Sequence, residues 1–204
     1  MAPRSYRLGR RAETAAATRE RIVSAAAALY QEQGVVATTL QQIAGRADVS
    51  RGTILHHFGG GDGLISAVAE HVLVELELPD EHIFDSAETA EQRLRAYVAA
   101  MLQFFRRSTG WWAVFVTEMQ RPELKAKEAE YYQSMGRLQA IALGDLAADR
   151  MANVVVGSLI HPGTIGGLIW VLEQAGLGPA QIDDAVADVV VAYVDRAHGA
   201  SGSH

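Results

Sequence analysis

The chain has 204 residues, of which 49% are hydrophobic and 21% charged, so a disordered chain is excluded and one large or two small domains are expected. It contains no cysteine, which excludes disulfides, thiolate metal sites and cysteine nucleophiles. No apolar run reaches the about 20 residues of a membrane-spanning helix, and no secretory signal is recognisable, so we expect a cytoplasmic protein.

The net charge of −6 is distributed unevenly along the chain. Residues 1–58 hold eight arginines and four acidic residues, whereas residues 59–204 hold ten basic and twenty acidic residues. A basic segment before an acidic body suits a protein whose N-terminal part binds a polyanion. A solvated arginine-rich tail would give the same pattern, so charge alone leaves both interpretations open.

The first predicted helix covers residues 18–33. Its apolar residues, from Ile22 to Tyr30, follow one another at three- and four-residue steps, as on one face of a helix. Gly34 supplies a stop signal. Residues 1–17, with arginines at positions 4, 7, 10 and 11, are expected to form a flexible basic arm.

Residues 38–58 (TTLQQIAGRADVSRGTILHHF) predict two short helices separated by a break at residues 45–50. Thr39 can cap the first of these helices, and Gln42, three residues later, can complete a capping box. The pattern therefore indicates a helix that ends early so that another can begin in a new direction.

The break has the features of a helix-turn-helix. Ala44 is small where the two helices would cross, Asp48 tolerates the positive φ of a tight turn, and Ser50 can cap the second helix. The second helix would then be free to enter a DNA major groove. A helical hairpin in an unrelated bundle is the alternative interpretation.

The rest of the chain also has helical spacing. Two β-branched runs, at residues 154–160 and 189–194, lie inside longer helix-spaced segments and are predicted as helix. We expect an all-α fold. Further helices are predicted over residues 62–76, 87–107, 111–120, 123–146, 150–174 (interrupted at 161–167) and 181–198.

Residues 18–68 resemble the TetR (tetracycline-repressor, AcrR-like) family of transcriptional regulators. They share an apolar first helix that ends in a glycine, paired threonines, the pattern IA..A.VS.GT over residues 43–53, and His-Phe at 57–58. The resemblance implies an N-terminal three-helix DNA-binding domain over residues 18–68. It also implies a C-terminal helical effector-binding and dimerisation domain over residues 69–200, leaving 201–204 as a tail or tag remnant.

By this resemblance, the helix from Ser50 to Phe58 would read DNA bases, and the paired threonines would bind phosphate where free N–H groups favour anions. Two departures remove expected phosphate contacts, because Leu55 stands where the family usually has tyrosine and Gly61 where it usually has lysine. The arginines of the N-terminal arm could compensate. The predicted DNA-binding residues are Thr38, Thr39, Ser50, Arg51, Gly52, Thr53, His56 and His57.

The resemblance also implies a homodimer on two half-sites and a small apolar or amphipathic effector that releases the operator. An intramolecular core is the alternative for the dimer residues, and an aromatic core is the alternative for the pocket residues. The predicted effector residues are Phe104, Trp111, Phe115, Met119, His161 and Trp170, within an aromatic cluster that includes Phe105 and Trp112. The predicted dimer residues are Val154, Ser158, Ile165, Ile169, Val186, Val189, Val190 and Tyr193.

Two other function classes compete with a ligand-responsive regulator. An all-helical enzyme is disfavoured because no metal-spaced histidine pair, nucleophile elbow or phosphate-binding loop occurs in the sequence. A DNA-binding protein without an effector remains an alternative. No cofactor or metal ion is expected.

Overall fold

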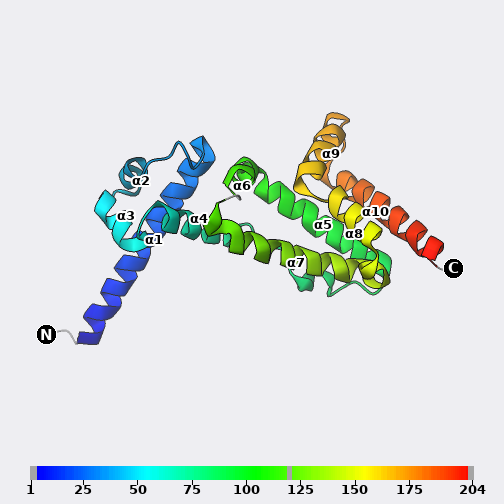
Figure 1. Cartoon of the computed structure of the whole chain (residues 1–204), viewed down its shortest axis with the longest axis horizontal. Helices are drawn as coiled ribbons and strands as arrows, with labels where there is room; N and C mark the ends of the chain where they lie inside the picture. Colours follow the sequence, from blue (N-terminus) through cyan, green and yellow to red (C-terminus); the bar gives the residue numbers. More distant parts are fainter. Residues whose placement is uncertain (1–3, 119–120, 202–204) are drawn as a thin grey trace. The chain divides into compact units, whose positions relative to one another are not determined.

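The structure is a computed structural model that describes residues 4–118 and 121–201. All regular secondary structure in these ranges is helical (Figure 1), which confirms the all-α prediction. The chain divides into two compact units. The first comprises Met1–Leu76 and Gly110–Glu128, and the second comprises Glu77–Thr109 and Ala129–His204.

The first unit has a core of fully buried branched side chains at Ile22, Ile43, Ile54, Leu64 and Val72. Each such side chain stabilises the fold by about 1.5–3 kcal/mol relative to leaving it exposed. The elements of this unit are α1 (Arg4–Gln33), α2 (Leu40–Ala47), α3 (Arg51–Phe58), α4 (Gly61–Glu75), α6 (Trp112–Glu118) and the 3-10 turn η3 (Pro122–Leu124), with η2 (Thr109–Trp111) at its border.

Helix α1 begins at Arg4, so the residues of the expected flexible arm that the structure describes are helical instead. The alanine-rich segment 12–17 has high helix propensity, and neither glycine nor proline interrupts the chain from Arg10 to Gln33. The packed part of α1 supplies the helix nucleus, so each added residue extends a helix that already exists.

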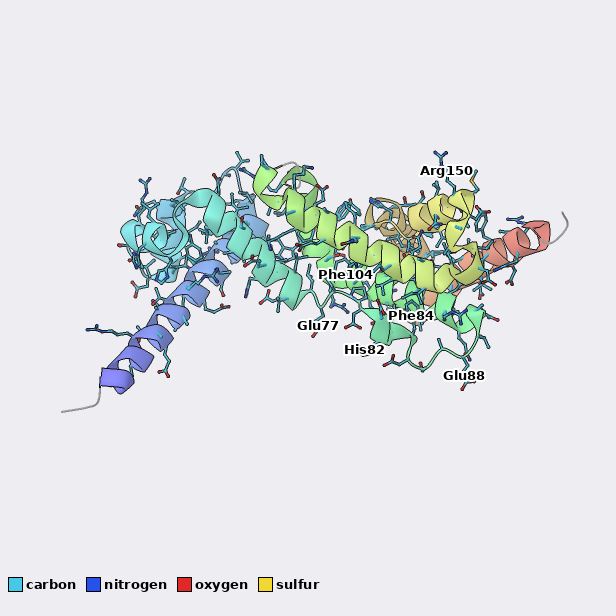
Figure 2. The ribbon with its side chains drawn as sticks, turned by 60° about the horizontal axis from the view of Figure 1, so that its bottom comes forward. Glu77, His82, Phe84, Glu88, Phe104 and Arg150 are labelled. Atoms are coloured by element: carbon cyan, nitrogen blue, oxygen red, sulfur yellow. The ribbon has the colours of Figure 1, made fainter. Side chains whose placement is uncertain are left out.

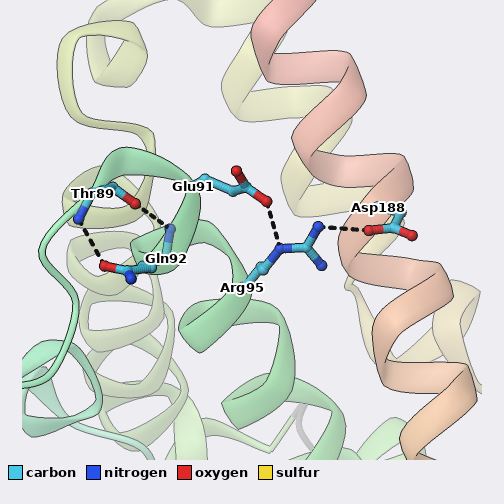
Figure 3. Close-up of polar contacts among 5 residues, drawn as sticks. All are labelled: Thr89, Glu91, Gln92, Arg95 and Asp188. Atoms are coloured by element: carbon cyan, nitrogen blue, oxygen red, sulfur yellow. Dashed lines mark hydrogen bonds and ion pairs between the residues drawn. The ribbon is translucent and has the colours of Figure 1, made fainter.

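The second unit is built around helix α5 (Ala90–Ser108). Thr89 caps it and forms a capping box with Gln92, while Arg95 bonds to Glu91 at 2.8 Å and to Asp188 of α10 at 2.7 Å (Figure 3). The other elements are η1 (Glu81–Phe84), α7 (Lys125–Leu143, from Ala129 onward), η4 (Gly144–Ala148), α8 (Arg150–Leu159), α9 (Pro162–Gln174) and α10 (Pro179–Ser201).

A polar network connects three of these helices. The Tyr97 hydroxyl of α5 bonds to Gln139 Oε1 of α7 at 3.3 Å, and Gln139 Nε2 donates to the Asn153 carbonyl of α8 at 3.0 Å. The segment from Glu77 to Glu88 contacts α5 through η1 (Figure 2). These contacts connect α5 directly with α7 and η1, and through α7 with α8.

Both β-branched runs are helical, as predicted, in α8 and α10, except that Ile160 at the end of the first run caps α8 and lies outside it. The predicted interruption after α8 is short, because α9 restarts at Pro162 after a His161 cap. Proline suits the first turn of a helix, where its missing N–H leaves no bond unmade. In the described part of the chain no single helix is long and apolar enough to cross a membrane. By length and composition alone, α8 and α9, bent by 51°, pass that test as a pair.

Candidate DNA-binding surface

The start of α2 carries the predicted capping box. Thr39 Oγ1 accepts from the Gln42 N–H at 3.2 Å, and Gln42 Oε1 accepts from the Thr39 N–H at 2.8 Å. Thr38 is half-buried, and its hydroxyl donates to the Gly34 carbonyl at 2.7 Å. Both threonine side chains thus have a structural role at the α1–α2 junction, beside the open N–H groups of the first turn of α2.

The turn between α2 and α3 has the predicted backbone. Asp48 has φ 52° and ψ 53°, and the Val49 N–H donates to the Ala44 carbonyl at 3.0 Å. Ala44 is 2% exposed, so the small residue lies where the two helices approach each other. The local geometry of a helix-turn-helix is therefore present.

Helix α3 presents polar groups to the surface and holds to the core through one fully buried residue. Ser50 Oγ accepts from the Thr53 N–H at 3.0 Å, and Ile54 is the buried residue. The side chains around Ile54 remain accessible. Arg51, Gly52 and His56 are exposed, and Thr53 and His57 are half-buried.

The end of α3 is fixed by contacts that sequence patterns did not reveal. Gly59 ends the helix with φ 74°, and the Arg19 guanidinium lies 5.2 Å from the centre of the Phe58 ring, a cation–π distance. A Cβ atom added at Gly63 would come within 2.0 Å of the Phe58 carbonyl oxygen. The glycine-rich segment 59–63 (GGGDG) was the available signal, but it does not show which glycine is sterically required.

An ion pair connects α1 and α2. Arg46 Nη1 lies 2.6 Å from Glu32 Oε1, and this hydrogen bond holds the pKa of the Glu32 carboxyl below its usual range. Both side chains are well exposed, so the pair contributes little to stability. It does show which flank of α1 faces α2.

Two predicted effector residues lie together in the first unit. Trp111 and Phe115 stack with ring centres 6.3 Å apart, and with Tyr30 they line a cavity of about 40 Å³. Burial raises the pKa of Tyr30 to about 12. Glu118, which pairs with Arg121, also lines the cavity. The volume suffices for water, whereas ligand pockets are typically about 300–1,000 Å³.

The other predicted effector residues have different surroundings. Phe104 lies in the second unit (Figure 2) and is buried, and its ring centre is 6.0 Å from that of Tyr131. His161 Nδ1 accepts from the Gly163 N–H at 3.1 Å and caps α9. Trp170 is 62% exposed, and Met119 lies outside the described residues.

The predicted dimer residues divide into two groups. The alternative of an intramolecular core accounts for Ile165, Ile169, Val186 and Val190, because their side chains pack inside the protomer. Tyr193 is half-buried, and Val154, Ser158 and Val189 are exposed. Large apolar side chains are exposed on all three of helices α8, α9 and α10, and we refer to them together as the apolar surface of α8–α10: Met151, Val154, Leu168, Trp170, Val171 and Val189.

Within residues 4–118 and 121–201, no three His, Asp or Glu side chains are grouped closely enough to hold a metal ion.

Known proteins share this geometry. Residues 22–68 match the family described as bacterial regulatory proteins, tetR family. The HTH-type transcriptional regulator BetI of Burkholderia lata is 30% identical over 168 residues, which are 74% of this chain and 84% of that protein.

Two solved structures share the fold. The flavonoid-responsive regulator FrrA is 22% identical, with a TM-score of 0.64 over 89% of this chain and 97% of its own. FadR from Bacillus subtilis, solved in complex with stearoyl-CoA, is 19% identical, with a TM-score of 0.59 over 84% of this chain and 97% of its own. Identities this low indicate a common fold and nothing more specific.

Proposed function

Because the chain belongs to the tetR family of bacterial regulatory proteins, we propose that this transcriptional regulator is a repressor that binds a palindromic operator as a homodimer. A small apolar or amphipathic effector releases it from the operator. The proposed site of action is the cytoplasm, where bacterial chromosomal DNA lies.

The polar surface of α3 is the observation that carries the DNA-binding proposal. The Ser50 cap begins the helix, Ile54 anchors it, and Arg51 lies exposed in its first turn. An arginine there can donate to guanine O6 and N7 in the major groove, and the Thr53 methyl can contact a thymine methyl. Thr38, Thr39, Ser50, Gly52, His56 and His57 complete the proposed surface.

The apolar surface of α8–α10 supports the homodimer. A single helix-turn-helix makes too few contacts for tight, specific binding, so two copies on two half-sites are needed. Exposed Trp170, Val171 and Val154 are apolar side chains of the kind that an isologous interface would bury. The proposed interface consists of the exposed members of this surface, together with Ser158 and Tyr193.

The names of the two structural neighbours support the proposed effector class. FrrA is called flavonoid-responsive, and a flavonoid is an aromatic compound. FadR was solved with stearoyl-CoA, which is amphipathic. For this chain we propose an effector of similar character. Release requires that the effector bind more tightly to a protomer arrangement in which the recognition helices no longer match the operator spacing.

The purified full-length chain is first used to select an operator from a random DNA library. Footprinting then maps the bases that the protein covers in the selected DNA. We expect a palindrome and a loss of affinity of about 10- to 100-fold in Arg51→Ala, because a bidentate arginine–guanine contact is worth about 1–3 kcal/mol. Arg137→Ala, at an exposed arginine of the second unit, is the matched control and should bind like the wild type. Selection of unrelated sequences would refute the proposal.

A second candidate is a DNA-binding protein without an effector. The cavity beside Trp111 and Phe115, at about 40 Å³, is not a site for a drug-sized effector. Titrating flavonoids and long-chain acyl thioesters into the protein–operator complex separates the candidates. Release by either class supports the effector-controlled repressor, and binding that ignores both favours the second candidate.

A further inference from the structure

Helix α1 extends beyond the body of the first unit (Figure 1). From Gly9 onward the first buried residue is Ile22, and residues 9–17 are all exposed. The distance along the helix axis from Arg10 to Ile22 is about 18 Å, at about 1.5 Å per residue. This extension is long enough to run along the side of a DNA duplex.

Arg10 and Arg21 lie on the flank of α1 that faces α2, and Arg11 lies on a neighbouring line of the same helix. Arg10, Arg21 and Glu32 recur every eleven residues, close to three full turns, so they form one line along the helix. Glu32 identifies this line as the α2 flank because it pairs with Arg46 of α2 at 2.6 Å. Arg11 stands eleven residues before Ile22, in line with the buried stripe.

The acidic residues of the same segment lie on a different flank. Glu13 and Glu20 are seven residues apart, again on one line of the helix. Glu20 Oε1 lies 3.4 Å from His71 Nδ1 of α4, which identifies this line as the α4 flank. The line of Arg10 and Arg21 therefore leads to the helix-turn-helix, and the line of Glu13 and Glu20 leads to α4.

We propose that the N-terminal extension of α1 binds the phosphate backbone of the operator beside the bases read by α3, through Arg10, Arg11 and Arg21. This inference rests on the proposed function of the helix-turn-helix. A membrane surface fits less well, because residues 9–17 contain no leucine, phenylalanine or tryptophan to enter lipid. Duplex DNA offers a regular row of negative charge to arginines that are held on a helix.

Arginine–phosphate pairs raise affinity without reading sequence. Each such pair steepens the dependence of log affinity on log salt concentration by about 0.9. Leu55 and Gly61 stand where the family usually has a phosphate-binding tyrosine and lysine. The arginines of the extension would supply phosphate contacts instead. The inference therefore predicts a change in salt dependence with no change in base preference.

The test compares the wild-type full-length chain with the double variant Arg10→Gln/Arg11→Gln. Glutamine retains good helix propensity, which circular dichroism verifies. Affinity for the selected operator and for a scrambled duplex is measured over a salt series. We expect at least tenfold weaker binding at low salt, a salt slope that is shallower by about 0.9 for each arginine–phosphate pair removed, and an unchanged ratio of operator to scrambled affinity.

Arg107→Gln/Arg137→Gln is the matched control, with two exposed arginines of the second unit outside α8–α10 and the same change in net charge. A wild-type salt slope in the N-terminal variant, an equal loss of affinity in the control, or a fall in the operator-to-scrambled ratio would each overturn the inference. If the wild type does not discriminate an operator at all, the proposed function fails. The slope on scrambled DNA then still tests the extension by itself.

Discussion

Helices α3 and α9 both expose much of their length, but they expose opposite chemistry. Helix α3 presents Arg51 and His56, whereas α9 presents Trp170 and Val171. The difference indicates the partner of each helix. A polar, cationic helix surface suits phosphates and base edges, and an apolar one suits another apolar protein surface.

The two helices are also held differently. Helix α3 has one fully buried side chain, Ile54, so its orientation depends on its ends at Ser50 and Gly59. Helix α9 buries Ile165 and Ile169 against its own unit. We therefore expect α3 to be sensitive to changes at its ends and α9 to be sensitive to changes on its exposed face.

The largest expected effect is at the end of α3. In Gly63→Ala the new Cβ would lie 2.0 Å from the Phe58 carbonyl oxygen, so α3 and α4 must separate. We expect the free energy of unfolding to fall by about 2–3 kcal/mol, measured by urea denaturation. Gly61→Ala is the control, since its Cβ meets nothing within 4 Å. Equal stability in the two variants would contradict this account of the α3–α4 junction.

The next effect concerns the exposed face of α9. Val171→Asp would place a charge in the proposed dimer interface and weaken dimerisation by about 2 kcal/mol, roughly 30-fold, in analytical ultracentrifugation. The control is Val74→Asp in α4, where the valine is 78% exposed and lies outside the apolar surface of α8–α10. If the dimer dissociation constant is the same in Val171→Asp as in the wild type, α9 does not lie in the dimer interface.

A smaller effect compares two equivalent helix caps. Thr39 and Thr89 each form a capping box with a glutamine three residues later. Thr39→Ala and Thr89→Ala should each lower the free energy of unfolding by about 1 kcal/mol. Only Thr39→Ala should also weaken operator binding, by about two- to tenfold, because its helix begins at the proposed phosphate site. Similar losses of DNA affinity in both variants would argue against a phosphate site at Thr39.

The smallest effect lies within α9 itself. Gly167→Ala adds a Cβ that meets nothing within 4 Å, so helix propensity should stabilise the protein by about 0.5–1 kcal/mol. Gly166→Ala adds a Cβ 2.8 Å from Phe105 Cζ, and displacing that ring should cancel the gain. Thermal denaturation compares the two variants, and an equal rise in Tm would show that Phe105 moves freely.

Much of the helix-turn-helix could be predicted from sequence because its determinants are local. The Thr39–Gln42 box, the positive φ of Asp48 and the Ser50 cap each involve residues within three or four positions of one another. Local hydrogen bonds and allowed backbone angles decide such features whatever surrounds them. The residues proposed to contact DNA remain a prediction, because their contacts lie outside the protein.

The sequence by itself determined the helical character of the chain, the break between α2 and α3, and the family pattern of residues 18–68. Only the tertiary structure decided which side of each apolar helix is buried. Ile165 and Ile169 entered the core while Trp170 did not, and Trp111 joined Tyr30, about eighty positions earlier in the chain. Helical periodicity requires one buried stripe, but packing against distant residues selects which stripe that is.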